Sequence, residues 1–202
     1  MNNEEGDKKR ALLVVDVQND FCPGGALGVW GGDEVVAPLN KLMADFLARG
    51  EMVFKSRDWH PPQTKHFETH GGPWPVHCVR NTPGAEFHPD LLDDPRVRII
   101  SKGLGDEDCY SAFDGTELSA LLRENGIEEV WIGGLATDYC VKNTVLDARR
   151  EGYTVKVVEE ATRPVEVHPG DGLRAVEEMR EAGAEIVTVP AKHHKKTTSQ
   201  AL

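Results

Sequence analysis

Long apolar runs are missing from this sequence. None approaches the roughly 18 residues that a membrane span needs, and the polar first ten residues lack the apolar stretch of a signal peptide. Cysteine is also scarce, with four residues in a chain of 202 and no C-x-x-C pair. Widely scattered cysteines in a long chain without secretory features favour reduced thiols over a disulfide framework. We therefore expect a cytoplasmic protein with no membrane partner.

Basic residues are too few to balance the acidic ones. The 23 Lys and Arg against 34 Asp and Glu give a formal net charge of −11, and the basic residues cluster at the two ends. The body of the chain is therefore more acidic than the whole. Because such a surface repels phosphate backbones, nucleic acid is excluded as an expected partner.

Several well-known catalytic and nucleotide-binding patterns are absent. The chain has no G-x-G-x-x-G, no G-x-x-x-x-G-K-[ST], no H-E-x-x-H and no G-x-S-x-G. Its hydrophobic fraction of 39% and charged fraction of 28% are ordinary for a globular protein. We expect one domain over residues 11–190, which includes a long loop insertion at 57–95, with tails at 1–10 and 191–202.

Apolar segments of strand-like and helix-like period alternate along the chain. Strands are predicted over Ala11–Val17, Glu51–Ser56, Arg96–Ser101, Glu129–Gly133, Tyr153–Val158 and Glu185–Val189. Helices are predicted over Glu34–Arg49, Gly115–Asn125, Thr137–Glu151 and Asp171–Ala182. This alternation is typical of an α/β fold with a doubly wound, mainly parallel six-stranded sheet and helices on both faces, a Rossmann-type three-layer arrangement.

Reactive side chains follow four of these strands where each strand ends. Asp16 follows the first strand, Asp58 and His60 the second, Lys102 the third, and Cys140 follows the fourth across a turn. Ligands of open α/β sheets bind beyond the carboxyl ends of the strands. We therefore expect these side chains to meet at one edge of the sheet.

Cys140 is a candidate nucleophile. It lies in the first turn of a predicted helix, where exposed N–H groups and the helix dipole lower a thiol pKa and can hold an oxyanion. Asp16 can accept the thiol proton, and Lys102 favours developing negative charge. A buried structural cysteine and a plain Asp–Lys ion pair are the alternatives.

The long loop 57–95 is rich in histidine. Asp58-x-His60 on an extended segment, with another histidine brought back by the loop, supplies nitrogen and oxygen ligands for a divalent transition metal. This donor set suits zinc first, and iron or manganese if water completes the shell. Because histidine-rich loops are also common on protein surfaces, spacing alone leaves a surface loop as the alternative.

Together these segments resemble the nicotinamidase/pyrazinamidase branch of the isochorismatase-like cysteine hydrolases. The motifs that carry the resemblance are Asp16-Val-Gln-Asn-Asp-Phe21, Arg57-Asp-Trp-His60, Trp74-Pro-Val-His77-Cys78, Lys102-Gly and Gly134-Leu-Ala-Thr-Asp-Tyr-Cys140-Val. They run in the family's order over about residues 11–189. The Asp, Lys and Cys motifs belong to the superfamily, whereas Asp-x-His with Trp-Pro-x-His-Cys is more specific to nicotinamidases.

The resemblance implies roles for individual residues. It makes Asp16, Lys102 and Cys140 a catalytic triad, and Asp58, His60 and His77 metal ligands, with His66 an extra ligand found in some members. It places Phe21, Trp74 and Tyr110 around a pyridine ring, although core packing is an alternative role for these three. It also implies a cis peptide at Leu135–Ala136 and an oxyanion hole formed by the N–H groups of Ala136 and Cys140.

The resemblance implies hydrolysis of nicotinamide to nicotinate and ammonia through a thioester on Cys140. It implies that pyrazinamide is accepted as a substrate analogue and that the reaction serves the salvage of NAD breakdown products. The metal would position the ring or activate water. The alternatives are a metal-free hydrolase of N-carbamoyl or ureido amides, cleavage of isochorismate, and a metal-binding scaffold without catalysis. The expected partner is a small-molecule amide, and a homo-oligomer is compatible with the sequence.

Overall fold

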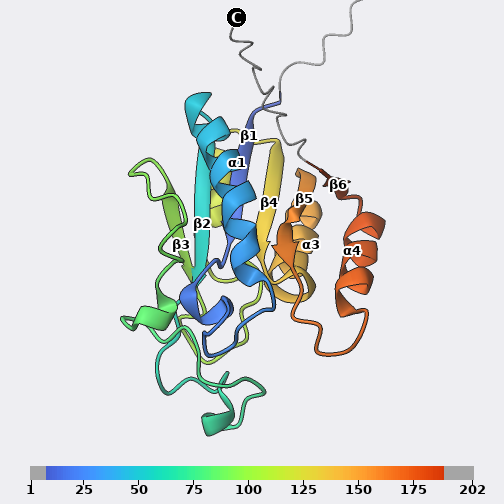
Figure 1. Cartoon of the computed structure of the whole chain (residues 1–202). Coiled ribbons are helices and arrows are strands. Elements are labelled where there is room, and N and C mark those ends of the chain that lie inside the picture. The colour runs from blue at the N-terminus through green and yellow to red at the C-terminus, as the bar shows by residue number, and fades with distance from the viewer. Residues whose placement is uncertain (1–7, 189–202) are drawn as a thin grey trace, which may run out of the picture.

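The computed structural model describes residues 8–188 and contains one six-stranded parallel sheet (Figure 1). Its spatial order is β3-β2-β1-β4-β5-β6. The strands are β1 Arg10–Val15, β2 Met52–Asp58, β3 Arg98–Lys102, β4 Glu129–Leu135, β5 Thr154–Arg163 and β6 Glu185–Val187. The helices are α1 Val36–Ala48, α2 Leu118–Glu124, α3 Lys142–Arg150 and α4 Asp171–Glu181. The predicted fold class is confirmed. The end of the predicted last strand at Val189 and the predicted tail at 191–202 lie outside the described residues.

The alternating directions of the apolar side chains along β1 explain why helices cover both faces of the sheet. Leu12 and Val14 share one buried cluster with the apolar side of α1, whereas Leu13 and Val15 share the other with residues of α2, α3 and α4. Successive side chains of a strand point to opposite faces, so a continuous apolar run is what a strand buried on both faces requires.

The winding direction of the sheet reverses between β1 and β4. From β1 the chain adds β2 and β3 on one side, whereas from β4 it adds β5 and β6 on the other. Ligands of such sheets bind at this switch point, beyond the carboxyl ends of the two central strands. Asp16 follows β1 directly, and the Leu135–Ala136 peptide at the end of β4 is cis, as the resemblance implies.

Glycine at the end of β4 allows the two central strands to approach each other. Gly134 has a φ of 131°, and a Cβ atom there would lie 2.0 Å from the Val15 carbonyl oxygen. No residue with a side chain can occupy this position without moving β1.

The ends of most elements differ from the sequence prediction by one to three residues, and two elements differ more. The ladder between β4 and β5 changes register between Ile132 and Gly134, and β5 therefore continues to Arg163 rather than ending at Val158. The segment predicted as one helix from Thr137 begins with a π-helical turn, Thr137–Val141, and becomes α-helical only at Lys142. Both irregularities lie beside the carboxyl edge, which is where such features often mark functional sites.

The long connection between β2 and β3 contains only two short 3₁₀ turns, Glu68–His70 and Pro83–Ala85. Isolated bridges join His60 to Val79 and Phe67 to Trp74. Although it lacks regular structure, this connection buries His60, His66, Phe67 and His77 beneath the sheet edge. Among the described residues, no helix is long and apolar enough to cross a membrane.

Candidate active site

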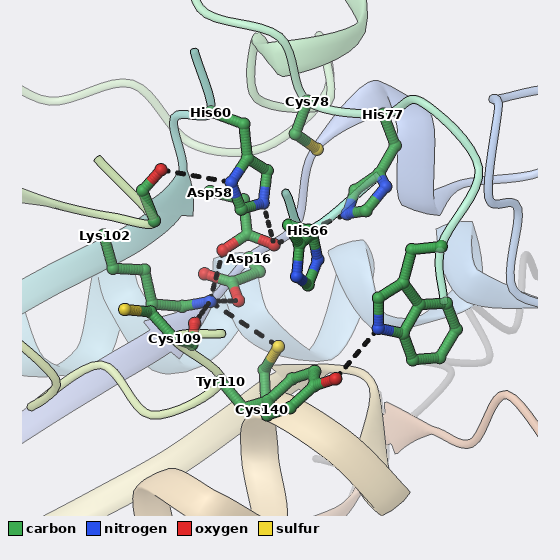
Figure 2. A network of polar contacts seen from close by, with 12 residues as sticks. Asp16, Asp58, His60, His66, His77, Cys78, Lys102, Cys109, Tyr110 and Cys140 are labelled. Atoms are coloured by element: carbon green, nitrogen blue, oxygen red, sulfur yellow. Dashed lines mark hydrogen bonds and ion pairs between the residues drawn. The ribbon is translucent and has the colours of Figure 1, made fainter. Parts of the chain in front are cut away.

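Asp16, Lys102 and Cys140 meet at the switch point, each from a different strand or turn (Figure 2). The Lys102 Nζ lies 2.9 Å from the Asp16 Oδ2 and 3.6 Å from the Cys140 Sγ. All three residues are buried, with Asp16 completely inaccessible and Cys140 7% exposed. A base, a cation and a thiol are therefore assembled in one site largely shielded from water.

Further contacts fix the positions of the base and the cation. The Ser56 hydroxyl donates a 2.6 Å hydrogen bond to Asp16 Oδ1. Lys102 donates to the Cys109 carbonyl oxygen at 3.0 Å and makes a short hydrogen bond to Asp58 Oδ1. Lys102 thus lies between two carboxylates and the sulfur, with its orientation fixed.

The titration behaviour of the triad follows from burial. Burial, aided by the nearby Asp58, raises the pKa of Asp16, although Lys102 opposes the shift. Burial alone would lower the pKa of Lys102, but the two carboxylates hold it well above its usual value. Asp16 is therefore a stronger base than an exposed aspartate, and Lys102 remains an ammonium ion.

The predicted acidification of Cys140 is wrong for the resting site. Burial raises the pKa of the Cys140 thiol well above its usual value; Lys102 lowers it, but Asp16 and Asp58 add to the increase. The helix-terminus prediction considered only the N–H groups and the helix dipole, whereas the structure places the thiol in a buried site with two carboxylates. The resting nucleophile is therefore a protonated thiol that needs a base.

Asp58 connects the triad to a cluster of three histidines. Its Oδ1 accepts from Lys102, while its Oδ2 lies 3.6 Å from His60 Nε2 and 4.0 Å from His77 Nε2. Although burial favours the neutral form, Lys102 and His60 hold the pKa of Asp58 well below its usual range. One carboxylate therefore contacts both groups of residues.

The histidine cluster fits a divalent metal ion. One ligand atom from each of His60, His66 and His77 lies within 4.8 Å of the others. His60 Nε2 is buried without a hydrogen-bond partner among the described residues, an unsatisfied atom that an ion would satisfy. Burial lowers the pKa of His77 to about 4 and also lowers that of His66. Neutral imidazoles at neutral pH are the form that binds metals.

The Nδ1 atom of each histidine, here called the outer nitrogen, faces away from the centre of the cluster and contacts another residue. His60 Nδ1 lies 3.1 Å from the Gly103 carbonyl oxygen, and His77 Nδ1 lies 2.7 Å from the Pro75 carbonyl oxygen. His66 Nδ1 makes a short contact with the Asp108 carboxylate. The remaining nitrogens are left for the centre of the cluster (Figure 2).

Two residues of the Asp16–Phe21 motif hold the ligand-bearing segments. The buried Gln18 amide donates to the Asp58 and Ala85 carbonyl oxygens at 2.8 and 2.9 Å and accepts from the Asp58 N–H at 2.8 Å. Asp20 accepts the Cys78 N–H at 2.7 Å, next to His77. The sequence analysis did not predict either role, although both residues lie in the Asp16–Phe21 motif.

A pocket of about 430 Å³, including its open mouth, lies against Cys140 and the histidine cluster. Phe21, Trp74 and Tyr110 line it together with Tyr139, which the sequence analysis did not single out. The Trp74 indole N–H donates to the Tyr110 hydroxyl at 2.8 Å, and the Trp74 and Tyr139 rings pack edge to face with centroids 5.0 Å apart. One side of the pocket is therefore an aromatic wall.

A backbone donor is available beside the nucleophile. Ala136 lines the pocket with Cys140, and its N–H has no hydrogen-bond partner among the described residues. Its carbonyl, by contrast, accepts from Tyr139 and Val141 and so begins the π-helical turn. Asp138 stabilises this turn by accepting from the N–H groups of Val165 and Glu166 at 2.8 and 3.0 Å.

Comparison with known families agrees with this geometry. The model of the Isochorismatase domain matches residues 10–191, which is most of the chain. The chain belongs to this family. A nicotinamidase of Escherichia coli is 42% identical to it, over 89% of this chain and 95% of the relative.

Solved structures of the family have the same fold. The pyrazinamidase of Pyrococcus horikoshii in complex with zinc is 45% identical and superposes with a TM-score of 0.85, covering 90% of this chain and 99% of that one. PnC1 of L. infantum in complex with nicotinate is 34% identical, with a TM-score of 0.82 and coverages of 90% and 93%.

Proposed function

We propose that this family member is a nicotinamidase, which hydrolyses nicotinamide to nicotinate and ammonia and accepts pyrazinamide as an analogue. The observation that carries the proposal is the joint presence of a buried Asp16–Lys102–Cys140 group and a three-histidine cluster, linked by Asp58 on one wall of an aromatic pocket. The similarity to a nicotinamidase and to a nicotinate-bound structure supports this choice of substrate. The reaction would serve the salvage of NAD breakdown products.

The first half of the reaction forms a thioester. Asp16 removes the proton of Cys140, and the sulfur attacks the carboxamide carbon. The N–H groups of Ala136 and Cys140 hold the oxyanion, and Lys102 places positive charge beside the developing negative charge. Asp16 then returns the proton to the amide nitrogen, the C–N bond breaks, and ammonia leaves.

The second half releases the acid. Water attacks the thioester carbon while Asp16 takes one of its protons, and the same donors again hold the oxyanion. The C–S bond breaks, and the proton on Asp16 returns to the Cys140 sulfur. The product leaves as nicotinic acid, which releases its remaining proton to solvent and becomes nicotinate, and the resting thiol and the Asp16 carboxylate are restored.

Asp58, His60, His66 and His77 would hold one divalent metal ion, and we propose zinc because three imidazoles and a carboxylate suit it. When bound, the ion supplies a Lewis-acid centre at the end of the pocket, where a pyridine nitrogen can be held. Phe21, Trp74 and Tyr110 would then fix the plane of the ring and leave the carboxamide facing Cys140.

A substrate panel tests the proposal. Purified protein with its metal is supplied in parallel with nicotinamide, pyrazinamide, N-carbamoyl amino acids and isochorismate, and ammonia or the cleaved product is measured. The proposal expects ammonia from the first two at rates far above those from the carbamoyl compounds. Turnover of carbamoyl amides alone would identify the alternative hydrolase, and cleavage of isochorismate alone would replace amide chemistry altogether.

A further inference from the structure

The three histidines of the cluster differ in what holds their outer nitrogens. Those of His60 and His77 face backbone carbonyl oxygens, which accept a hydrogen bond but carry no net charge. The outer nitrogen of His66 instead faces the Asp108 carboxylate. His66 is therefore the one histidine of this cluster whose outer partner is a charged side chain that a substitution can remove.

Asp108 lies on the segment that joins β3 to α2, more than 40 positions from His66 in sequence. The next two residues of that segment also contact the active site. The Cys109 carbonyl accepts from Lys102 at 3.0 Å, and the Tyr110 hydroxyl accepts from Trp74 at 2.8 Å. The position of Asp108 is thus fixed by a segment that is itself held at two further points.

We propose that Asp108 is a positioning residue for the metal centre and sets its affinity through His66. The carboxylate accepts from Nδ1–H, which fixes the tautomer and the ring orientation and leaves Nε2 to the ion. A carboxylate in this place also makes the imidazole a stronger ligand, and removing such partners typically costs about 10–100-fold in metal affinity or activity. The inference rests on the metal role in the proposed function, but not on the identity of the amide.

The neighbouring Asp106 provides a matched control. It lies on the same segment, and its carboxylate contacts the Lys65 N–H at 3.3 Å and the Lys65 ammonium at 3.7 Å, next to His66 in sequence. It therefore connects the same two loops with the same charge but does not contact the imidazole. A purely structural or long-range electrostatic role would affect both positions alike.

The test measures Co²⁺ and Zn²⁺ binding to metal-free protein by competition with a chelator. Asp108→Ala is expected to weaken both affinities by about 10–100-fold, and Asp108→Asn by less, because the amide oxygen can still accept from Nδ1–H. Asp106→Ala should stay near the native value. Thermal unfolding of the metal-free variants shows whether each has folded. A loss in Asp106→Ala equal to that in Asp108→Ala would overturn the inference.

Two further measurements show whether Asp108 acts through His66. In a His66→Gln background, Asp108→Ala should cause no additional loss of affinity, because the partner is already gone. The visible absorption of bound Co²⁺, which reports the ligand set, should change in Asp108→Ala toward the spectrum of His66→Gln. Additive losses, or a spectrum unaffected by His66→Gln, would refute the proposal. Neither measurement requires substrate turnover. Their outcome is therefore independent of whether the protein hydrolyses nicotinamide.

Discussion

The ammonium group of Lys102 lies 3.6 Å from the Cys140 sulfur and 2.9 Å from the Asp16 carboxylate. It is the single cation in contact with the proton donor, the proton acceptor and Asp58 among the described residues. Moving a proton from sulfur to Asp16 leaves Lys102 beside the new negative charge. The position of this side chain therefore accounts for how a buried thiol with a raised pKa can still react.

Replacing Lys102 with methionine should impair both catalysis and folding. Loss of the charge beside the oxyanion is expected to lower kcat by about 10²–10³-fold. Removing one partner of a buried ion pair typically costs roughly 3–5 kcal/mol of unfolding free energy, because the remaining carboxylates lose their counter-charge. Steady-state kinetics and denaturant unfolding measure the two effects.

Lys55→Met is the matched control for that prediction. Lys55 is also buried, but its ammonium group faces Asp93 and the Leu92 carbonyl, away from the triad. Its loss should reduce stability at most and leave kcat near native. A comparable fall in kcat for Lys55→Met would show that activity tracks stability rather than the charge at Cys140.

Ser56→Ala should move the acid side of the pH–rate profile upward. The hydroxyl donates to the Asp16 carboxylate and so lowers the pKa of that group. Without it, the pKa of Asp16 rises, and the base stays protonated up to a higher pH. The acidic limb of kcat/KM is therefore expected at higher pH than in the native enzyme. An unchanged limb, or one at lower pH, would contradict the role of Asp16 as base.

Tyr110→Phe should weaken substrate binding more than chemistry. The substitution removes the acceptor of the Trp74 indole N–H, so the Trp74 ring is no longer held by this hydrogen bond. One such hydrogen bond contributes about 0.5–1.5 kcal/mol, which corresponds to roughly a two- to tenfold higher KM. Tyr153→Phe is the control, since the Tyr153 ring packs against Phe113 and does not line the pocket. An equal increase in KM for both variants would contradict a role of the Trp74–Tyr110 hydrogen bond in substrate binding.

Gly103→Ala should weaken metal binding. Gly103 has a φ of 67°, and a Cβ there would lie 2.5 Å from His60 Cε1, so the imidazole would have to move. Gly105→Ala is the control on the same segment, because its Cβ would meet nothing within 4 Å. Equilibrium dialysis against Zn²⁺ should show a large loss for the first variant and none for the second. Native affinity in Gly103→Ala would remove His60 from the ligand set.

The sequence was sufficient to predict the sheet and to bring distant residues together. Buried parallel strands appear as continuous apolar runs, and their carboxyl ends must share one edge. That rule alone placed Asp16, Asp58, Lys102 and Cys140 near one another. The same rule placed His60, and its spacing from Asp58 indicated a metal site. The assignment of His66 and His77 as ligands came only from the resemblance, because the aperiodic loop gives no periodic pattern from which to place them.

The supporting residues could not be read from local patterns. Asp108 contacts His66 across more than 40 positions in sequence, and Tyr139, which lines the pocket, lies in the π-helical turn before α3. The direction of the thiol pKa depends on burial by the folded chain, which local sequence does not report. Long-range contacts of this kind follow from the tertiary packing.

The central claim, that Cys140 attacks the amide, is tested most directly by ammonia release from nicotinamide in Cys140→Ala, with Cys109→Ala alongside. Both cysteines line the pocket, but only the Cys140 sulfur contacts Lys102. We expect release to vanish in Cys140→Ala and to persist in Cys109→Ala. Release at the native rate in Cys140→Ala would contradict the thioester mechanism.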